Sequence, residues 1–335
     1  MLKITKTVID QPFPTQNVSN PCSGDYLRDI EAQIQKVIST SENETMNICL
    51  HILKAGGKRV RPLLVWYSGL MFGEVSETLL QTTVAVELIH MASLIHDDLI
   101  DGSSFRRNQP TVHNIWGNHK AVLAGDYLFA KAFGILTDSN LIKSLNILAK
   151  VVETMCLGEI AQAGDEFNHQ TNLEMYFNRI TQKTAVLLEA ACQVGAQAGK
   201  ADETQVAAMG WFGRNLGLAY QIVDDILDIC GDEANLGKPK YIDIIKGNLT
   251  LPMILILQQP EYSQSIKAII LEKAFTTENL RKIETAIRNS GVIHQSFRIA
   301  FTYLDKARTI LNGFVESPAR QFLFDLTTKL QTRAN

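Results

Sequence analysis

Five long stretches of this sequence show helical periodicity with mostly apolar residues. The expected helices span residues 76–101, 119–136, 140–167, 172–199 and 202–230, and shorter ones fill residues 250–333. Several are apolar on more than one face, which is typical of helices buried inside a large bundle. No alternating runs predict a hairpin, and no βαβ rhythm appears. The sequence therefore predicts an all-α fold, a large helical bundle.

The N-terminal residues differ from the rest of the chain. Residues 1–24 are polar for the most part and contain three prolines, so we expect a loosely ordered N-terminal arm. Helical spacing begins after Asp25, and no low-complexity segment interrupts the chain from there to the end. We expect residues 25–335 to form a single domain.

Composition excludes several classes of protein. The formal net charge is -3, without the basic excess of a nucleic-acid-binding protein. The five cysteines form no CxxC pair and no zinc-ligand spacing, which indicates free thiols in a reducing compartment. Residues 1–24 have no apolar core of a secretory signal, and no run of about 18 apolar residues predicts a membrane span. We expect a cytoplasmic protein.

An acidic motif occurs twice, each time at the end of a long apolar helix. The first copy has Asp97, Asp98 and Asp101. The second copy has Asp224, Asp225 and Asp228. In each, the outer aspartates are four residues apart and share one helix face.

These carboxylates lie where a helix disfavours anions, because the macrodipole is negative at the C-terminal end. Two close carboxylates repel by about 4 kcal/mol at an effective dielectric of 20. A single DDxxD run is most often a solvated charged face, but two such helix ends indicate a counter-ion. Oxygen ligands without His or Cys favour Mg²⁺, which also binds phosphates.

Basic residues complement the aspartates. Lys58, Arg59 and Arg61 follow the pair Gly56-Gly57, and other cations stand at Arg106, Arg107, Lys183 and Lys238. Any one of them is most simply a surface charge. Together they supply guanidinium and ammonium donors for phosphate, so metal-binding acids and phosphate-binding bases predict a polyphosphorylated substrate.

The ordered motifs resemble those of the trans-isoprenyl diphosphate synthases over about Asp25 to the C-terminus. They are GGKRVRP, HMASLIHDDLIDGSSFRRNQPTVH, GDYLFAKA, GEIAQ, KTA and YQIVDDILDICGDEANLGKP. The resemblance implies the isoprenoid synthase-type helical bundle around a central cavity, with both acidic motifs at its mouth. It also implies prenyl transfer, the Mg²⁺-dependent condensation of isopentenyl diphosphate with an allylic diphosphate such as farnesyl or geranylgeranyl diphosphate.

The resemblance assigns roles to individual residues. Mg²⁺ ions, about three per site, would be held by the six aspartates of the two motifs. The allylic diphosphate would be held by Arg106, Lys183, Gln221 and Lys238, with Thr184 beside the reacting carbons. The isopentenyl diphosphate would be held by Lys58, Arg61, His90 and Arg107. A histidine on an apolar helix face is often a core residue, but His90 matches the family's position two turns before Asp97.

Small residues before the first motif predict a long product. A helix rises about 1.5 Å per residue, so Ser93 lies about 6 Å and Ile89 about 12 Å below Asp97, on the expected cavity floor. Family members that make short products tend to have an aromatic residue where this chain has Ala92 or Ser93. We expect a product of about six to ten isoprene units, suited to a quinone tail. Deeper residues such as Leu88, Ile89 or Met155 could instead set the length.

Two positions depart from the common family pattern. Asn108-Gln109 stands where relatives often have Gly-Lys, and Asn248 stands where many have a lysine. The second difference removes one basic contact to the allylic diphosphate, and Lys246 could replace it. Long-chain members often share the asparagine.

Several alternatives stay open at this stage. The chain could be a short-chain geranylgeranyl diphosphate synthase, the catalytic half of a heteromeric heptaprenyl-type enzyme with a small regulatory subunit, or a non-catalytic helical partner. A class I terpene cyclase would not need Lys58, Arg61 and Arg107, and a non-catalytic partner would not need both acidic motifs. The family is typically dimeric, so we expect a homodimer.

Overall fold

The computed structural model describes residues 26–39, 43–231 and 240–333, most of which are helical. The N-terminal half contains α1 (Tyr26–Ile38), α2 (Asn43–Lys54), α3 (Val60–Leu70), α4 (Glu77–Ile100), α5 (Val112–Trp116), α6 (Asn118–Asp138) and α7 (Ile142–Gly164). The C-terminal half contains α8 (Leu173–Ile180), a π-helical turn η1 (Thr181–Ala185), α9 (Val186–Ala198), α10 (Glu203–Cys230), α12 (Ile242–Ile245), α13 (Leu251–Leu257), α14 (Pro260–Leu271), α15 (Thr277–Asn289), α16 (Val292–Asn312) and α17 (Pro318–Arg333). The all-α prediction is confirmed, whereas the predicted arm at residues 1–24 lies outside the described residues.

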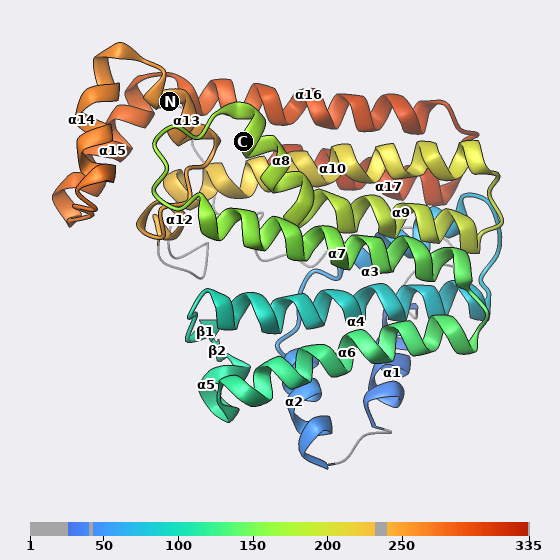
Figure 1. The fold of residues 1–335 in the computed structure, drawn as a ribbon. Helices are drawn as coiled ribbons and strands as arrows, with labels where there is room; N and C mark the ends of the chain where they lie inside the picture. The colour runs from blue at the N-terminus through green and yellow to red at the C-terminus, as the bar shows by residue number, and fades with distance from the viewer. Residues whose placement is uncertain (1–25, 40–42, 232–239, 334–335) are drawn as a thin grey trace.

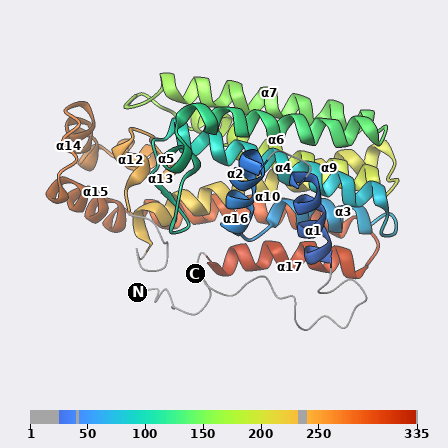
Figure 2. The ribbon, with the colours of Figure 1, turned by 90° about the horizontal axis from the view of Figure 1, so that it is seen from below.

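The long helices form the body of the molecule. Figure 1 shows α4, α6, α7, α9, α10 and α16 lying side by side, and Figure 2 shows α17 on the face opposite α7, where it packs on α3. Helices α4 and α10 are central, because α4 packs on α3, α6 and α9, and α10 packs on α9 and α16. Both end at the same side of the bundle, where the short helix α12 also lies (Figure 1).

Local sequence signals fix where the two central helices begin. The Oγ of Ser76 accepts a hydrogen bond from the backbone N–H of Leu79 at the start of α4. At the start of α10, Asp202 and Gln205 form a reciprocal capping box. Such caps satisfy amides that have no partner within the helix, and so they set the register of each helix.

Close helix packing depends on glycine at one crossing. A Cβ added to Gly195 of α9 would lie 2.2 Å from the carbonyl oxygen of Val65 in α3. Only glycine lets these two backbones approach so closely, so this crossing brings α3 firmly against the core.

Helix α4 is long and apolar enough to cross a membrane by length and composition alone. However, 72% of its most apolar 18-residue window is buried inside the fold. Its residues Val84, Ile89 and Ala92 are fully buried among neighbouring helices. In this structure α4 is therefore a core helix of the bundle.

One small hairpin was not predicted. Strands β1 (Phe105–Arg106) and β2 (Gln109–Pro110) pair antiparallel just after α4. The two residues between them, Arg107 and Asn108, have φ angles of 51° and 60°. Two central residues with positive φ are the signature of a type I′ turn, and asparagine tolerates this conformation better than most residues. The sequence lacked the alternating flanks that would have revealed so short a hairpin.

Candidate active site

A cavity of about 890 Å³ opens at the end of the bundle where α4 and α10 terminate. This size suits a small-molecule site. Twelve of the predicted site residues line it, namely Lys58, Arg61, His90, Asp98, Asp101, Arg106, Arg107, Lys183, Thr184, Gln221, Asp224 and Asp225. The two acidic motifs and the basic cluster therefore meet in one cavity, as the sequence predicted. Lys238 lies outside the described residues.

Other predicted residues do not line this cavity. Asp97 and Asp228 are close to it in the same helical turns but are absent from its wall. The cavity-facing residues of α4 include His90, Met91 and Leu94, which share one helical face. Ile89, Ala92 and Ser93 lie off this face and are buried in the core. They do not floor the cavity described here, and their effect on product length stays a prediction.

The aspartates of the first acidic motif interact with nearby cations. Asp98 is buried, and both its oxygens accept hydrogen bonds from Nε of Arg106, at 2.8 and 2.9 Å. Burial, followed by the charge of Glu159, raises the pKa of Asp97 to about 6. Asp101 receives an ion pair from Lys246 of the segment after α12, with Nζ 3.2 Å from Oδ2. Asp98 and Asp101 are thus each paired with a cation from a neighbouring segment.

The second acidic motif is deeper. Asp225 is buried and accepts hydrogen bonds from the hydroxyl of Tyr176 at 2.7 Å and from Nε2 of Gln221 at 2.8 Å. Burial, and then the charge of Asp243, raises the pKa of Asp225. One oxygen of Asp228 accepts a bond from the backbone N–H of Asp243 at 3.4 Å. A cation placed beside such a buried carboxyl group favours its ionised form.

The donor set at the mouth fits magnesium. Carboxylates of Asp98, Asp101, Asp224 and Asp225 share the cavity wall. Within residues 26–39, 43–231 and 240–333, no three Asp, Glu, His or Cys side chains are arranged to hold a metal ion by themselves. Mg²⁺ is usually held by one or two carboxylates together with waters and substrate phosphates, so an open set of acids is what it requires.

The basic side of the cavity is built from three segments. Nη1 of Arg61, in α3, lies 3.1 Å from Nε2 of His90, in α4. Arg107 comes from the hairpin turn, and a Cβ on Gly57 would lie 2.4 Å from its Nη1. Gly57 therefore leaves room for a guanidinium, which explains the glycine before the basic run. Lys58 also lines the wall.

The protonation of His90 follows from its neighbours. Arginine can only donate, so Nε2 of His90 accepts from Arg61 and the ring proton belongs on Nδ1. Burial, and then the charges of Arg61 and Arg107, lowers the pKa of His90 well below 6.5. Nδ1 of His90 and Nε of Arg61 are buried and make no protein hydrogen bond among the described residues. Both are donors that an anionic ligand could satisfy.

Arg59 lines the same cavity and is also paired with carboxylates of two neighbouring helices. Its φ of 48° is left-handed, and its Nη1 lies 2.6 Å from Oε1 of the buried Glu87. It also pairs with Glu31 and donates to the carbonyl of Leu53. Arg59 thus connects the glycine loop to α1, α2 and α4. Sequence reasoning did not predict these contacts, because they join segments that are far apart in the sequence.

Lys183 and Thr184 lie in the π-helical turn between α8 and α9. The Thr184 hydroxyl donates to Oε1 of Gln221 at 2.7 Å, and Nζ of Lys183 lies 2.6 Å from Oε1 of Glu159. Single π-helical turns inside α-helices are frequent at functional sites. Sequence reasoning found the two residues but not the turn, and it missed Tyr176, Glu159 and Asp243 entirely.

This chain belongs to the polyprenyl synthetase family, whose sequence pattern matches residues 42–287. It is 37% identical to heptaprenyl diphosphate synthase component 2 of Geobacillus stearothermophilus, over 92% of this chain and 96% of that protein. It is 33% identical to a geranylgeranyl diphosphate synthase of Saccharolobus solfataricus, over 84% and 88% of the two chains. The fold superposes on a decaprenyl diphosphate synthase of Rhodobacter capsulatus with a TM-score of 0.88 and 33% identity, over 93% and 97% of the two chains. The bundle is therefore the isoprenoid synthase fold, and the chain is a prenyltransferase by family.

Proposed function

We propose that this chain elongates an allylic diphosphate with isopentenyl diphosphate, in a Mg²⁺-dependent manner, to a long all-trans polyprenyl diphosphate. One observation supports this above all others. A single cavity is lined both by the two aspartate-rich helix ends and by Arg61, His90 and Arg107. A site for one metal-bound diphosphate and a second, metal-free diphosphate needs both sets of residues.

The acidic region suits the allylic substrate. Asp98, Asp101, Asp224 and Asp225 would hold Mg²⁺, which when bound neutralises the charge that develops on a departing diphosphate. Lys183, in the same wall, places an ammonium group where it can bind phosphate oxygens. When the diphosphate is held in this way, the allylic C–O bond breaks and pyrophosphate is the leaving group.

The basic region suits isopentenyl diphosphate. His90 and Arg61, whose buried Nδ1 and Nε make no protein hydrogen bond among the described residues, line the same cavity as Lys58 and Arg107. These donors orient the second substrate so that its double bond attacks the allylic cation. A proton is then lost from the product, and the released pyrophosphate can accept it.

Part of the cavity wall is apolar. Met91, Leu94, Ile180, Leu188 and Leu227 contribute this part of the lining. A carbocation survives only where no water can capture it, so this apolar lining favours attack by the alkene over hydrolysis. No side-chain nucleophile is required.

The finer features of the proposal concern length and assembly. The similarity to a heptaprenyl and a decaprenyl diphosphate synthase supports a product of about six to ten isoprene units, with a geranylgeranyl product as the alternative. The relative in Geobacillus is named as one component of its enzyme. We therefore propose that this chain is a catalytic subunit, working as a homodimer or together with a smaller second protein.

The deciding experiment incubates the purified chain with Mg²⁺, labelled isopentenyl diphosphate and farnesyl diphosphate, and then resolves the dephosphorylated products by length. A ladder that ends at one long product supports the proposal. EDTA should abolish it, and added Mg²⁺ should restore it. Asp98→Asn and Asp225→Asn should each lower kcat by about a hundredfold or more. The matched control is Asp305→Asn, an exposed aspartate of α16, which should leave kcat unchanged. A folded, inactive wild-type chain would contradict self-sufficient catalysis.

A further inference from the structure

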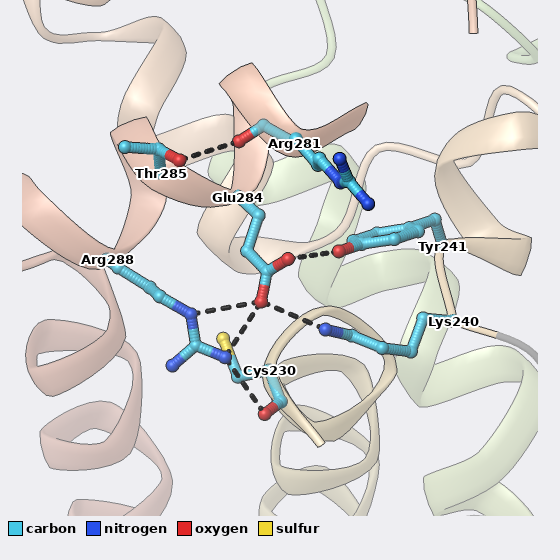
Figure 3. A network of polar contacts seen from close by, with 7 residues as sticks. All are labelled: Cys230, Lys240, Tyr241, Arg281, Glu284, Thr285 and Arg288. Carbon is cyan, nitrogen blue, oxygen red and sulfur yellow. Dashed lines mark hydrogen bonds and ion pairs between the residues drawn. The ribbon is translucent and has the colours of Figure 1, made fainter. Parts of the chain in front are cut away.

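A cluster of charges lies beyond the second acidic motif, outside the cavity. Glu284 of α15 is its centre (Figure 3). One carboxylate oxygen, Oε1, lies 2.9 Å from Nζ of Lys240 and accepts from Nε and Nη2 of Arg288 at 3.0 and 2.8 Å. The other oxygen accepts from the hydroxyl of Tyr241. We call Glu284, Lys240, Tyr241 and Arg288 the Glu284 cluster.

The Glu284 cluster is more than a surface ion pair. The side chains of Glu284 and Lys240 are only 19% and 14% exposed. Burial raises the pKa of Glu284, but hydrogen bonds from Tyr241, Lys240 and Arg288 outweigh it and lower the pKa to about 2. Several partners on one partly buried carboxylate make a fixed geometry, unlike an isolated exposed pair.

The cluster joins the end of α10 to the start of α12. Nη2 of Arg288 donates to the carbonyl of Cys230, the last residue of α10, at 3.2 Å. Tyr241 is the residue before α12 and has a φ of 65°. A left-handed conformation is unfavourable for tyrosine, so surrounding contacts must hold it. The hydroxyl bond to Glu284 is one such contact.

What Tyr241 holds in place is part of the cavity wall. Its backbone N–H donates to the carbonyl of Asp228 at 3.1 Å. Two residues later, the N–H of Asp243 donates to the carboxylate of Asp228. Lys246, just after α12, pairs with Asp101 of the first motif. Helix α12 therefore touches both acidic motifs, and its orientation starts at Tyr241.

We infer that Glu284 is a positioning residue for the aspartate-rich side of the active site, acting through Tyr241 and α12. Helices α14 and α15 project from the bundle at the end where the cavity opens (Figure 1), and α15 thereby gains a role in substrate binding. The inference rests on the proposed function, because it assigns this side to the allylic diphosphate. The basic side, built on α3 and α4, should not depend on the cluster.

The test compares Glu284→Gln and Tyr241→Phe with the control Glu278→Gln. Glu278 forms an exposed pair with Lys282 on the same helix and does not contact α10 or α12 in any bond that the structure shows. For the two cluster variants we expect KM for farnesyl diphosphate to rise by about tenfold, the change that corresponds to losing one charge-assisted hydrogen bond. KM for isopentenyl diphosphate should stay within about twofold, and Glu278→Gln should match the wild type.

A second measurement does not depend on activity. Lys240 is held by Glu284, so limited digestion with trypsin should cut after Lys240 several times faster in Glu284→Gln than in wild type or Glu278→Gln, as followed by mass spectrometry. Equal cleavage, or an equal rise of both KM values, would overturn the inference. An inactive wild-type chain with the expected digestion pattern would instead overturn the proposed function and leave the structural link intact.

Discussion

Lys246 and Asp101 form an ion pair in the wall of the cavity, with Nζ of the lysine 3.2 Å from Oδ2 of the aspartate. The lysine follows α12, and the aspartate ends α4. Two residues further on, Asn248 lines the cavity where many family members have a lysine. Its Oδ1 is buried and makes no protein hydrogen bond in the described part of the chain. We predict that the cation at position 246 serves in place of one at position 248.

Lys246→Gln should therefore weaken binding of the allylic diphosphate. We expect its KM to rise by about tenfold, as for loss of one charged hydrogen-bond donor to phosphate. The double variant Lys246→Gln with Asn248→Lys should regain most of the affinity, because it restores a lysine at the position that is common in the family. Steady-state kinetics with farnesyl diphosphate as the varied substrate would measure both. A double variant no better than the single one would contradict this exchange of roles.

Tyr176 is a residue that the sequence did not single out, and it should matter for the metal. It is fully buried, and its hydroxyl donates to Asp225. Tyr176→Phe removes one of two side-chain donors that orient this carboxylate, at a cost of about 1 kcal/mol. We expect a higher Mg²⁺ concentration at half-maximal rate and a lower kcat. Tyr303→Phe, a half-buried tyrosine away from the cavity, is the control. Unchanged Mg²⁺ dependence in Tyr176→Phe would show that Gln221 alone suffices.

His90 should bind isopentenyl diphosphate as a neutral donor. Burial and the charges of nearby arginines lower its pKa well below 6.5, which favours the neutral ring at pH 7 to 8. His90→Gln retains an N–H donor, and we expect its pH profile of kcat/KM to match the wild type over this range. His90→Phe removes the donor and should raise KM for isopentenyl diphosphate by about tenfold, with KM for farnesyl diphosphate unchanged. A wild-type inflection between pH 6 and 8 that disappears in His90→Gln would show that the charged imidazolium takes part.

The sequence predicted those site residues that lie together in short motifs. The aspartates of α4 and α10, and the basic run after Gly57, each lie within a few residues of one another, so spacing alone places them on one helix face or one loop. The structure places most of these residues in the wall of one cavity, and the roles assigned to them stay predictions. The helix bounds were also close, because long apolar periodicity is a strong signal, as for α4 at Glu77–Ile100.

Other features depend on contacts between distant segments, which a single sequence does not show. Tyr176 reaches Asp225 across 49 residues, and Lys240 reaches Glu284 across 44. The cavity-facing side of α4 is set by how that helix is rotated against its neighbours. The helical rise per residue predicted how far Ser93 and Ile89 lie below Asp97, but not the direction in which their side chains point. Tyr241 has a left-handed backbone conformation, and because it is neither glycine nor asparagine the sequence does not reveal it.

The product length should still respond to Ala92. This residue is fully buried, so Ala92→Phe forces a ring into packed core next to the cavity-facing turn of Met91 and Leu94. We expect a shorter ladder, with a loss of stability of about 1–3 kcal/mol from overpacking. Ala92→Leu should have a smaller effect on both. Product analysis and thermal unfolding of the same samples would separate the two effects. A folded Ala92→Phe enzyme with the wild-type product would assign length control to other residues.

The Glu284 cluster also predicts how stability depends on pH. The pKa of Glu284 is lowered from its usual 4.5 to about 2 by hydrogen bonds that outweigh burial. A carboxyl with a lowered pKa in the folded state stabilises the fold above the unfolded pKa, and this contribution is lost as pH falls through the window between the two values. Glu284→Gln should therefore unfold at lower urea concentration than the wild type at pH 5 to 7. The gap between the two midpoints should narrow steadily below pH 4.5. Glu278→Gln, which removes only an exposed pair, should show a small gap throughout. A gap for Glu284→Gln that stayed constant down to pH 3 would mean that hydrogen-bond geometry, rather than the negative charge of Glu284, holds α15 to the start of α12.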